Sequence, residues 1–310
     1  MILCCGEALI DMIPAQTGSG EKAYLPLAGG AVYNTAIALG RLECPAGMLT
    51  GLSTDLFGQQ LATGLTASNV DTSLCITSSR PTTLAFVELT GGHASYTFYD
   101  ENSAGRLLSP EELPPLPTSV TALYLGGISL AVEPCAEAYA ALAADAGDRV
   151  VMIDPNIRPG FIKDENRYRD RLDRMTARAD ILKVSDEDLH WLEPGDATLA
   201  DKAARLQAKG AGIVLVTKGK DGALGFLQNG QQVSVHGQSV TVVDTVGAGD
   251  TFNAGVLASL QDRKLLSREA LAKAGAEDIS QALAFGAKVA AVTVSRAGAN
   301  PPWRSELTAA

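Results

Sequence analysis

Short apolar runs alternate with helical patterns along most of this chain of 310 residues. The apolar runs have the length and continuity of strands buried on both faces, and they cover residues 46–50, 122–125, 150–153, 181–184 and 213–217. The helical patterns cover residues 34–42, 56–68, 134–146, 167–178, 199–209, 249–263, 267–274 and 278–295. This alternation predicts an α/β fold, in which helices cover a mostly parallel central sheet. Ligands of such sheets bind where the strands end at their carboxyl edge.

Two regions interrupt the alternation. Residues 12–30 are a loop-rich stretch with little helical character, and residues 74–99 contain short alternating runs at 83–89 and 94–99, separated by Gly91-Gly92. The second pattern is typical of a β-hairpin. We expect a small β-layer, formed from about residues 12–30 and 74–100, that folds over the site as a lid; an edge hairpin of the main sheet is the alternative. Because no linker or internal repeat is present, we expect one domain over residues 1–310.

Composition excludes several classes of protein. Hydrophobic residues make up 46% and charged residues 19%, as in a well-packed soluble protein. A net charge of −10 disfavours binding to nucleic acid or to anionic membranes. The first residues lack a basic segment and no run reaches membrane-spanning length, so a cytoplasmic location is expected.

The cysteines and histidines indicate neither a metal site nor a hydrolase. The five cysteines have no metal-ligand spacing, and the neighbours Cys4 and Cys5 are expected on opposite faces of a buried strand. Only three histidines are present, which gives little basis for a histidine metal site or a Ser-His-Asp triad.

The segment with the clearest chemistry is Asp-Thr-Val-Gly-Ala-Gly-Asp at residues 244–250, directly before a helical run. Small residues at a helix start expose N–H groups to an anion, and the helix dipole favours negative charge there. Asp250 follows at once and is placed to accept a proton, so the segment combines the two parts that phosphoryl transfer to a hydroxyl needs. The alternative is an ordinary glycine turn, with an acid that is favoured in the first helical turn by the dipole alone.

Polar residues elsewhere indicate a site for a hydroxylated ligand. Gly29 and Gly30 precede a helix in which Asn34 is placed to bond a hydroxyl, although a turn and helix cap is the commoner use of these residues. Asp11 ends the first strand segment, where a solvated turn residue is the alternative. Arg158 lies between prolines after the strand at 150–153, and prolines that only stop the strand are the alternative.

Two further segments leave alternatives open. Lys183 precedes Ser185 and three acids, a pattern suited either to ordering the water shell of Mg²⁺ or to a helix capping box. Residues 217–222, Thr-Lys-Gly-Lys-Asp-Gly, form either a glycine turn under a phosphate or ribose or a plain hairpin turn.

These segments, taken in order, resemble the ribokinase or pfkB-type carbohydrate kinase family over essentially the whole chain. Those at residues 6–11, 154–158 and 183–188 are most similar to bacterial fructokinases. The resemblance implies a three-layer α/β domain with a β-strand lid, through which many members dimerise. It also implies ATP and Mg²⁺ as cofactors, and a potassium-type cation site at the backbone around Asp244 and Val246 occurs in related members.

The resemblance assigns roles position by position. Asp250 matches the base that deprotonates the sugar hydroxyl. The remaining matches are Gly247, Ala248 and Gly249 for the anion hole; Asp11, Gly29, Gly30, Asn34 and Arg158 for the sugar; Lys183, Ser185, Thr217, Gly219, Gly222, Ala287 and Asn300 for the nucleotide; and Asp188 for the metal. Many members have Asn-x-x-Glu where this chain has Ser185 and Asp188, so the metal contacts are the least defined part of the match.

The resulting hypothesis is an ATP-dependent sugar kinase that converts fructose to fructose 6-phosphate. The nearest alternatives are a 2-keto-3-deoxygluconate kinase, in which Arg158 or Arg106 would bind the substrate carboxylate, and another sugar or nucleoside kinase of the family. A non-catalytic sugar or nucleotide sensor is the alternative of a different class. It is disfavoured because a sensor needs no proton acceptor at position 250.

Overall fold

Most of the chain is organised around one large sheet in the computed structural model, which describes residues 1–90 and 93–307. Within these residues the sheet has nine strands in the order β15-β14-β13-β12-β11-β10-β1-β4-β6. Their bounds are Gln232–Val235, Ala223–Phe226, Ile213–Thr217, Ile181–Ser185, Val150–Asp154, Ala122–Gly126, Ile2–Cys5, Ala46–Leu49 and Val70–Asp71. All neighbours from β13 to β6 are parallel, and β14 and β15 add an antiparallel edge. The predicted α/β fold is therefore confirmed.

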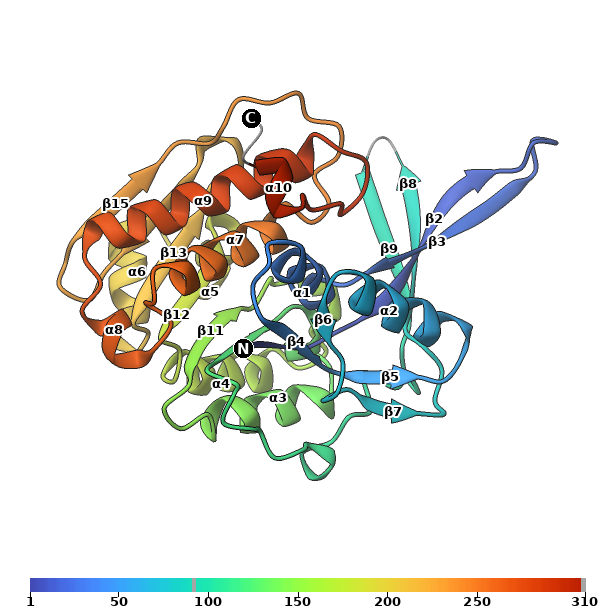
Figure 1. Cartoon of the computed structure of the whole chain (residues 1–310), viewed down its shortest axis with the longest axis horizontal. Helices are drawn as coiled ribbons and strands as arrows, with labels where there is room; N and C mark the ends of the chain where they lie inside the picture. Colours follow the sequence, from blue (N-terminus) through green and yellow to red (C-terminus); the bar gives the residue numbers. More distant parts are fainter. Residues whose placement is uncertain (91–92, 308–310) are drawn as a thin grey trace.

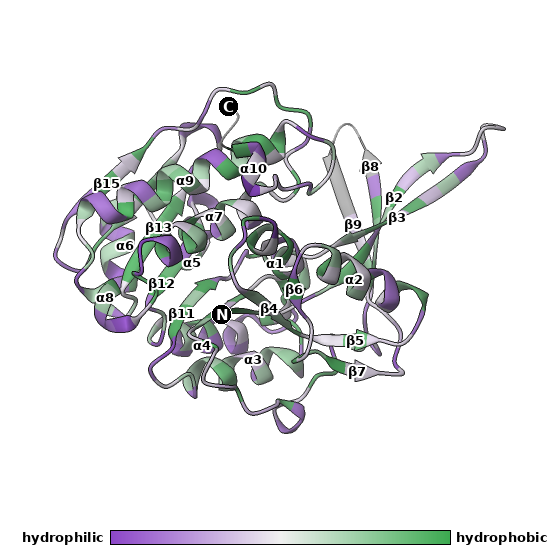
Figure 2. Ribbon diagram, viewed as in Figure 1, coloured by the Kyte–Doolittle hydropathy of each residue, from purple (hydrophilic) through white to green (hydrophobic). Residues whose placement is uncertain are grey.

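Helices cover both faces of this sheet and give three layers (Figure 1). One face packs against α1 (Ala31–Arg41), α2 (Leu56–Ala67), α7 (Ala248–Asp262), α8 (Arg268–Ala272), α9 (Ala276–Val294) and α10 (Arg304–Leu307). The other packs against α3 (Cys135–Ala144), α4 (Glu165–Thr176), α5 (Asp186–Leu192) and α6 (Leu199–Ala208). The two cores divide the central strands by residue parity, so that Cys4 and Cys5 are buried in opposite cores, as predicted. Figure 2 shows the hydrophobic residues concentrated along these central strands.

A second sheet stands apart from the first. In the described chain it has four strands in the order β3-β2-β8-β9, with bounds Lys22–Gly29, Leu9–Gln16, Leu84–Thr90 and His93–Tyr99. The prediction of a loop-rich stretch at residues 12–30 was wrong, because most of it forms the antiparallel pair β2–β3. The predicted hairpin at 83–99 is confirmed as the pair β8–β9, and its Gly91-Gly92 link lies outside the described residues. The expected separate β-layer is present, and the alternative of an edge hairpin of the main sheet is wrong.

The β2–β3 pair extends away from the body of the molecule, beside α2 (Figure 1). A short two-stranded sheet, β5 (Gly51–Ser53) with β7 (Ile76–Ser78), lies below it. No helix in residues 1–90 and 93–307 is long and apolar enough to cross a membrane.

Candidate active site

Most of the predicted site residues line one cleft, of about 580 Å³, at the carboxyl ends of the central strands. The turns after β1, β10, β11, β12 and β13 form its floor, the start of α7 forms one wall, and β2 and β9 of the second sheet form another. Its lining includes these predicted residues: Asp11, Gly30, Arg158, Lys183, Ser185, Asp188, Thr217, Gly219, Gly247, Ala248, Gly249 and Asp250.

Asp250 lies in the first turn of α7 and is only 7% exposed. Its Oδ2 accepts a hydrogen bond from Asn34 Nδ2 at 2.9 Å, and its carbonyl oxygen accepts one from Thr35 Oγ1 at 3.2 Å. Burial raises the pKa of Asp250 to about 7, and the bond from Asn34 opposes that rise. Among the nearby charges, Asp154 and Glu7 raise this pKa and Lys183 lowers it. A carboxylate with a pKa near neutrality, facing a cleft, is suited to general base catalysis.

The predicted anion hole is a tight turn into α7. Gly247 caps the helix in the left-handed conformation, with φ of 79°, and Ala248 and Gly249 are the next two residues. The first N–H groups of a helix have no acceptor within the helix, and such groups can bind an anion. In this structure the N–H of Ala248 donates to the Thr245 carbonyl oxygen at 3.3 Å, within the turn. Asp244 holds the turn in place, since its two carboxylate oxygens accept hydrogen bonds from the N–H groups of Val246 and Gly298.

The end of the cleft formed by the second sheet is built around Asp11. The prediction that Asp11 ends the first strand was wrong, because β1 ends at Cys5 and Asp11 lies within β2. Burial raises the pKa of Asp11 to about 6. A Cβ at Gly29 would lie 2.1 Å from Asp11 Oδ2, so a glycine is required there for the carboxylate to occupy its position. Phe98 of β9 packs edge-on against Phe161, with ring centroids 4.3 Å apart, and both line the cleft. A polar group beside an aromatic wall is a common arrangement for a sugar, which has both hydroxyls and apolar C–H faces.

The predicted nucleotide residues divide into two sets. Lys183, Ser185, Thr217 and Gly219 line the cleft. Gly222, Ala287 and Asn300 do not. A Cβ at Gly222 would lie 2.0 Å from the Val235 carbonyl oxygen, which explains that glycine by strand packing. Ala287 packs against the core, and Asn300 Oδ1 accepts a bond from Arg41. A role for these three in binding a nucleotide stays a prediction.

Asp188 has two structural tasks in the cleft. Its Oδ2 accepts a bond from the Ser185 N–H in a capping box, and its Oδ1 accepts one from the Ile157 N–H at 3.0 Å. Burial raises the pKa of Asp188. No group of three or more metal-ligating side chains occurs in the described part of the chain. Mg²⁺ keeps several waters and takes most other ligands from phosphates, so Asp188, with its remaining lone pairs, fits a water-mediated contact.

Sequence reasoning missed two buried acids. Glu7 follows β1, and its carboxylate accepts bonds from the N–H groups of Ala31 and Ser129, which joins the starts of two segments that border the cleft. Asp154 ends β11 and pairs with Lys183 at 2.9 Å. Only the position of each acid directly after a predicted strand could have indicated it. The partners of each lie far along the chain, where the sequence gives no signal.

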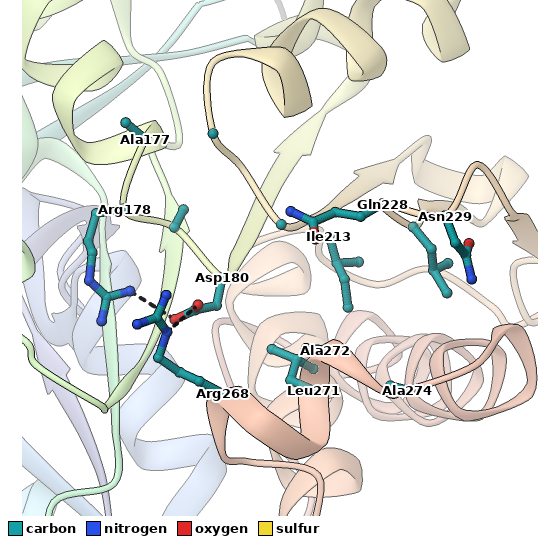
Figure 3. A pocket seen from close by; sticks show the side chains of 14 residues that line it. Ala177, Arg178, Asp180, Ile213, Gln228, Asn229, Arg268, Leu271, Ala272 and Ala274 are labelled. Carbon is teal, nitrogen blue, oxygen red and sulfur yellow. Dashed lines mark hydrogen bonds and ion pairs between the residues drawn. The ribbon is translucent and has the colours of Figure 1, made fainter.

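A second cavity, of about 480 Å³, lies at the amino ends of β12 and β13, whereas the cleft lies at their carboxyl ends. Figure 3 shows the side chains that line it. Its charged groups are already paired: Asp180 binds Arg178 and Arg268, each at 3.0 Å. Because these charges are paired with one another, the cavity is explained by ion pairs that connect α8 to the strands. None of the predicted site residues lines it.

The fold and the cleft together define a phosphotransferase that acts on a small hydroxylated acceptor. A protein-family model described as the pfkB family carbohydrate kinase matches residues 1–306, and the chain belongs to this family. Over 274 residues it is 52% identical to a fructokinase of Rhizobium leguminosarum bv. trifolii, covering 88% of this chain and 83% of the relative. The resemblance seen in the sequence is thereby confirmed.

Solved structures agree with this relationship. A fructokinase from Xylella fastidiosa with bound ATP superposes with a TM-score of 0.89 at 30% identity, covering 99% of this chain and 97% of that one. A fructokinase from Vibrio cholerae O395, bound to fructose, ADP and calcium ion, gives 0.84 at 27% identity, with coverage of 99% and 97%. The protein is an ATP-dependent sugar kinase.

The Asn34–Asp250 contact predicts a shift in pH dependence. We expect kcat/KM to fall below a pH of about 7, as Asp250 takes up a proton. Replacing Asn34 with Ala removes a donor that favours the charged carboxylate, so the acid limb should move to higher pH. Initial rates measured from pH 5 to 9 check the shift, with Asn229→Ala in the second cavity as a control. An unmoved limb in Asn34→Ala would contradict the role of this bond.

Proposed function

We propose that the protein transfers the γ-phosphoryl group of ATP to fructose and forms fructose 6-phosphate. The supporting observation is that Asp250, with a pKa near neutrality, lies at the start of α7 in the same cleft as Asp11 and Arg158. The names of the relatives, which are fructokinases, support fructose as the acceptor.

In this mechanism Asp250 accepts the proton of the sugar hydroxyl as its oxygen forms a bond to the γ-phosphorus. The bond from that phosphorus to the β–γ bridging oxygen breaks, and ADP is the leaving group. The N–H groups at Gly247, Ala248 and Gly249 stabilise the negative charge that develops on the phosphoryl oxygens. For Ala248 this requires the N–H to exchange its bond with the Thr245 carbonyl oxygen for one with the phosphoryl group. Lys183, whose Nζ would lie 3.5 Å from a Cβ at Gly249, adds positive charge beside them.

The sugar is held by hydrogen bonds from the other end of the cleft. Asp11 and Arg158 form hydrogen bonds with its hydroxyls, and Gly30, which has no side chain, lets the sugar approach the backbone. We propose Mg²⁺ as the metal, with Asp188 holding it through water; when bound, it neutralises charge on the transferring phosphates. The turn at Asp244 and Val246 is the proposed position for a monovalent cation, and one structural neighbour contains potassium ion.

The structure weakens the case for 2-keto-3-deoxygluconate as the acceptor. Arg106, one of the two cations considered for its carboxylate, does not line the cleft. Its guanidinium pairs with Asp100 at 2.7 Å and donates to the Glu133 carbonyl oxygen. Of these two arginines, Arg158 is the one that lines the cleft.

A coupled assay of ADP release tests the proposed acceptor. Fructose, ribose, adenosine and 2-keto-3-deoxygluconate are compared at equal ATP, and kcat/KM is measured for each. Fructose should give the highest value. A higher value for another acceptor would replace fructose within the same enzyme class, whereas sugar binding without ADP release from any acceptor would favour a sensor.

We also propose that the second sheet is a lid of a single domain and a dimer interface. Several large apolar side chains are exposed on it outside the cleft: Tyr24 (47%), Leu25 (52%), Leu27 (40%) and Tyr99 (60%). Exposed apolar side chains gathered on one element are typical of a protein–protein contact.

The dimer is tested by replacing Leu25 with Asp. A charge at this exposed position should leave the fold unchanged and shift sedimentation from dimer to monomer. Leu56→Asp, on the exposed start of α2, is the control (75% exposed). A wild-type protein that sediments as a monomer at all concentrations would rule out the interface.

A further inference from the structure

The most connected buried acid near the cleft is Asp154, at the end of β11. It is 1% exposed, and its two oxygens accept three bonds, two from distant segments and one from the loop directly after β11. Oδ2 accepts from Lys183 Nζ at 2.9 Å and from Asn253 Nδ2 at 2.7 Å. Oδ1 accepts from the N–H of Asn156 at 3.1 Å. None of the roles assigned above includes this carboxylate.

Each of these bonds reaches a different part of the proposed reaction. Lys183 lies on β12 beside Gly249 of the anion hole. Asn253 is on α7, three residues after Asp250 and therefore on the next turn of the same helix. Asn156 lies two residues before Arg158 and has a φ of 42°, a backbone conformation that residues other than glycine rarely adopt. The carboxylate thus contacts the phosphate side, the helix of the base and the sugar side of the cleft.

We propose that Asp154 is a positioning residue, whose carboxylate sets the distances between the anion hole, the base helix and the loop of Arg158. The proposal rests on the site roles assigned above. Bonds to a charged acceptor are the stronger kind, and burial strengthens them further. A group that touches no substrate can then control the rate, since a displacement of about 1 Å in a catalytic site costs about 100-fold.

The charge of Asp154 gives this role a signature that a purely structural role lacks. Asp250 is faced by Asn34 from α1, by Glu7 after β1, by Tyr124 from β10, by Asp154 from β11 and by Lys183 from β12. Asp154→Asn removes a negative charge from this set and leaves Lys183 without its partner. Both changes favour the ionised form of Asp250, so its pKa should fall and the acid limb of kcat/KM should move to lower pH.

Asp180 provides a matched control. It precedes β12, and its carboxylate likewise accepts from three groups: Arg178, Arg268 and the N–H of Val151. It lines the second cavity, where Figure 3 shows it between Arg178 and Arg268, and it does not line the cleft. Asp180→Asn therefore removes a similar set of bonds without touching the cleft.

The experiment measures kcat, KM for each substrate, the pH profile and thermal unfolding in the full chain. Asp154→Asn should lower kcat/KM about 100-fold and move the acid limb to lower pH. Asp180→Asn should lose thermal stability but keep wild-type kinetics and the wild-type limb. The proposal is overturned if Asp154→Asn is destabilised like Asp180→Asn and retains wild-type kinetics and pH profile.

A second variant covers the case in which Asp154→Asn does not fold. Asn253→Ala removes the bond of Asp154 to α7, together with the bond that Asn253 Nδ2 donates to the Tyr124 hydroxyl. It should lower kcat while leaving KM for ATP near the wild-type value. Wild-type kcat in this folded variant would overturn the proposal. Asp250→Asn in the same assay distinguishes failure of the proposed function from failure of the role of Asp154. If Asp250→Asn is active, the proposed catalytic site is wrong. If Asp250→Asn is inactive while the Asp154 and Asn253 variants keep wild-type kinetics, only the role of Asp154 is wrong.

Discussion

Replacing Asp250 with Asn is expected to lower kcat by about 10²–10⁴-fold, because the amide cannot accept the proton of the attacking hydroxyl. The side chains have nearly the same shape, and the amide oxygen can keep the bond from Asn34 Nδ2, now 2.9 Å long. We therefore expect the fold and ATP binding to survive. Steady-state ADP release at saturating sugar and ATP, together with equilibrium dialysis of ATP, checks both expectations.

Asp262 supplies the control for this prediction. It is the last residue of the same helix, is exposed, and pairs with Arg304. Asp262→Asn should turn over sugar at the wild-type rate. Near-normal turnover by Asp250→Asn would remove that residue from the chemistry and refute the proposed mechanism.

Replacing Gly247 with Ala is expected to reduce kcat by about 10²–10³-fold, the effect of losing an oxyanion-type donor. Gly247 has a φ of 79°, and a Cβ there would lie 2.7 Å from Ala299 Cβ. The turn must shift to relieve this contact, and the N–H groups of the anion hole move with it. Steady-state kinetics and thermal unfolding of the variant measure the two consequences.

Gly147 separates backbone strain from the loss of the anion hole. It also has a positive φ, 59°, but a Cβ there would meet open space. Gly147→Ala should lose stability of about 1–2 kcal/mol from the left-handed backbone alone and keep its kcat. Equal kcat in the two alanine variants would show that the turn at Gly247 does not bind the transferring group.

The sequence predicted the parts of the fold that local patterns control. The central strands and the long helices were predicted within a few residues, because burial on both faces gives continuous apolar runs. The start of α1 was predicted at Asn34 and lies at Ala31, since Gly30 caps the helix with its backbone and without a side-chain cap. The antiparallel edge strands β14 and β15 were not predicted as strands, although the alternative of a hairpin turn at residues 217–222 is confirmed by the pair β13–β14. They are short, and the glycines at their turns also fit a phosphate loop.

The candidate site was predicted where its residues occur in compact motifs. Asp250 and its glycines adjoin each other in sequence and in space. The contact of Asn34 with Asp250 joins residues 216 positions apart, and only the resemblance placed both in one site. Asp154 belongs to the motif at residues 154–158, yet its proposed role depends on Asn253, 99 positions away. Tertiary packing brings these pairs together, and a single sequence carries no trace of it.

The pairing of β2 with β3 also limits how this chain can change in length during evolution. Leu9 is opposite Gly29 and Asp11 is opposite Leu27, so the acid occupies the space that a side chain at position 29 would fill. Gaining or losing one residue in β2 before Asp11 would turn Asp11 to the other face of the sheet, away from the cleft, and the same change in β3 would move its side chains relative to Asp11. The loop at residues 17–21 is free of this restriction, because a Cβ at Gly18 meets nothing within 4 Å. Length variation should therefore accumulate at the loop and be absent from the strands, a difference that an insertion scan of the hairpin would reveal.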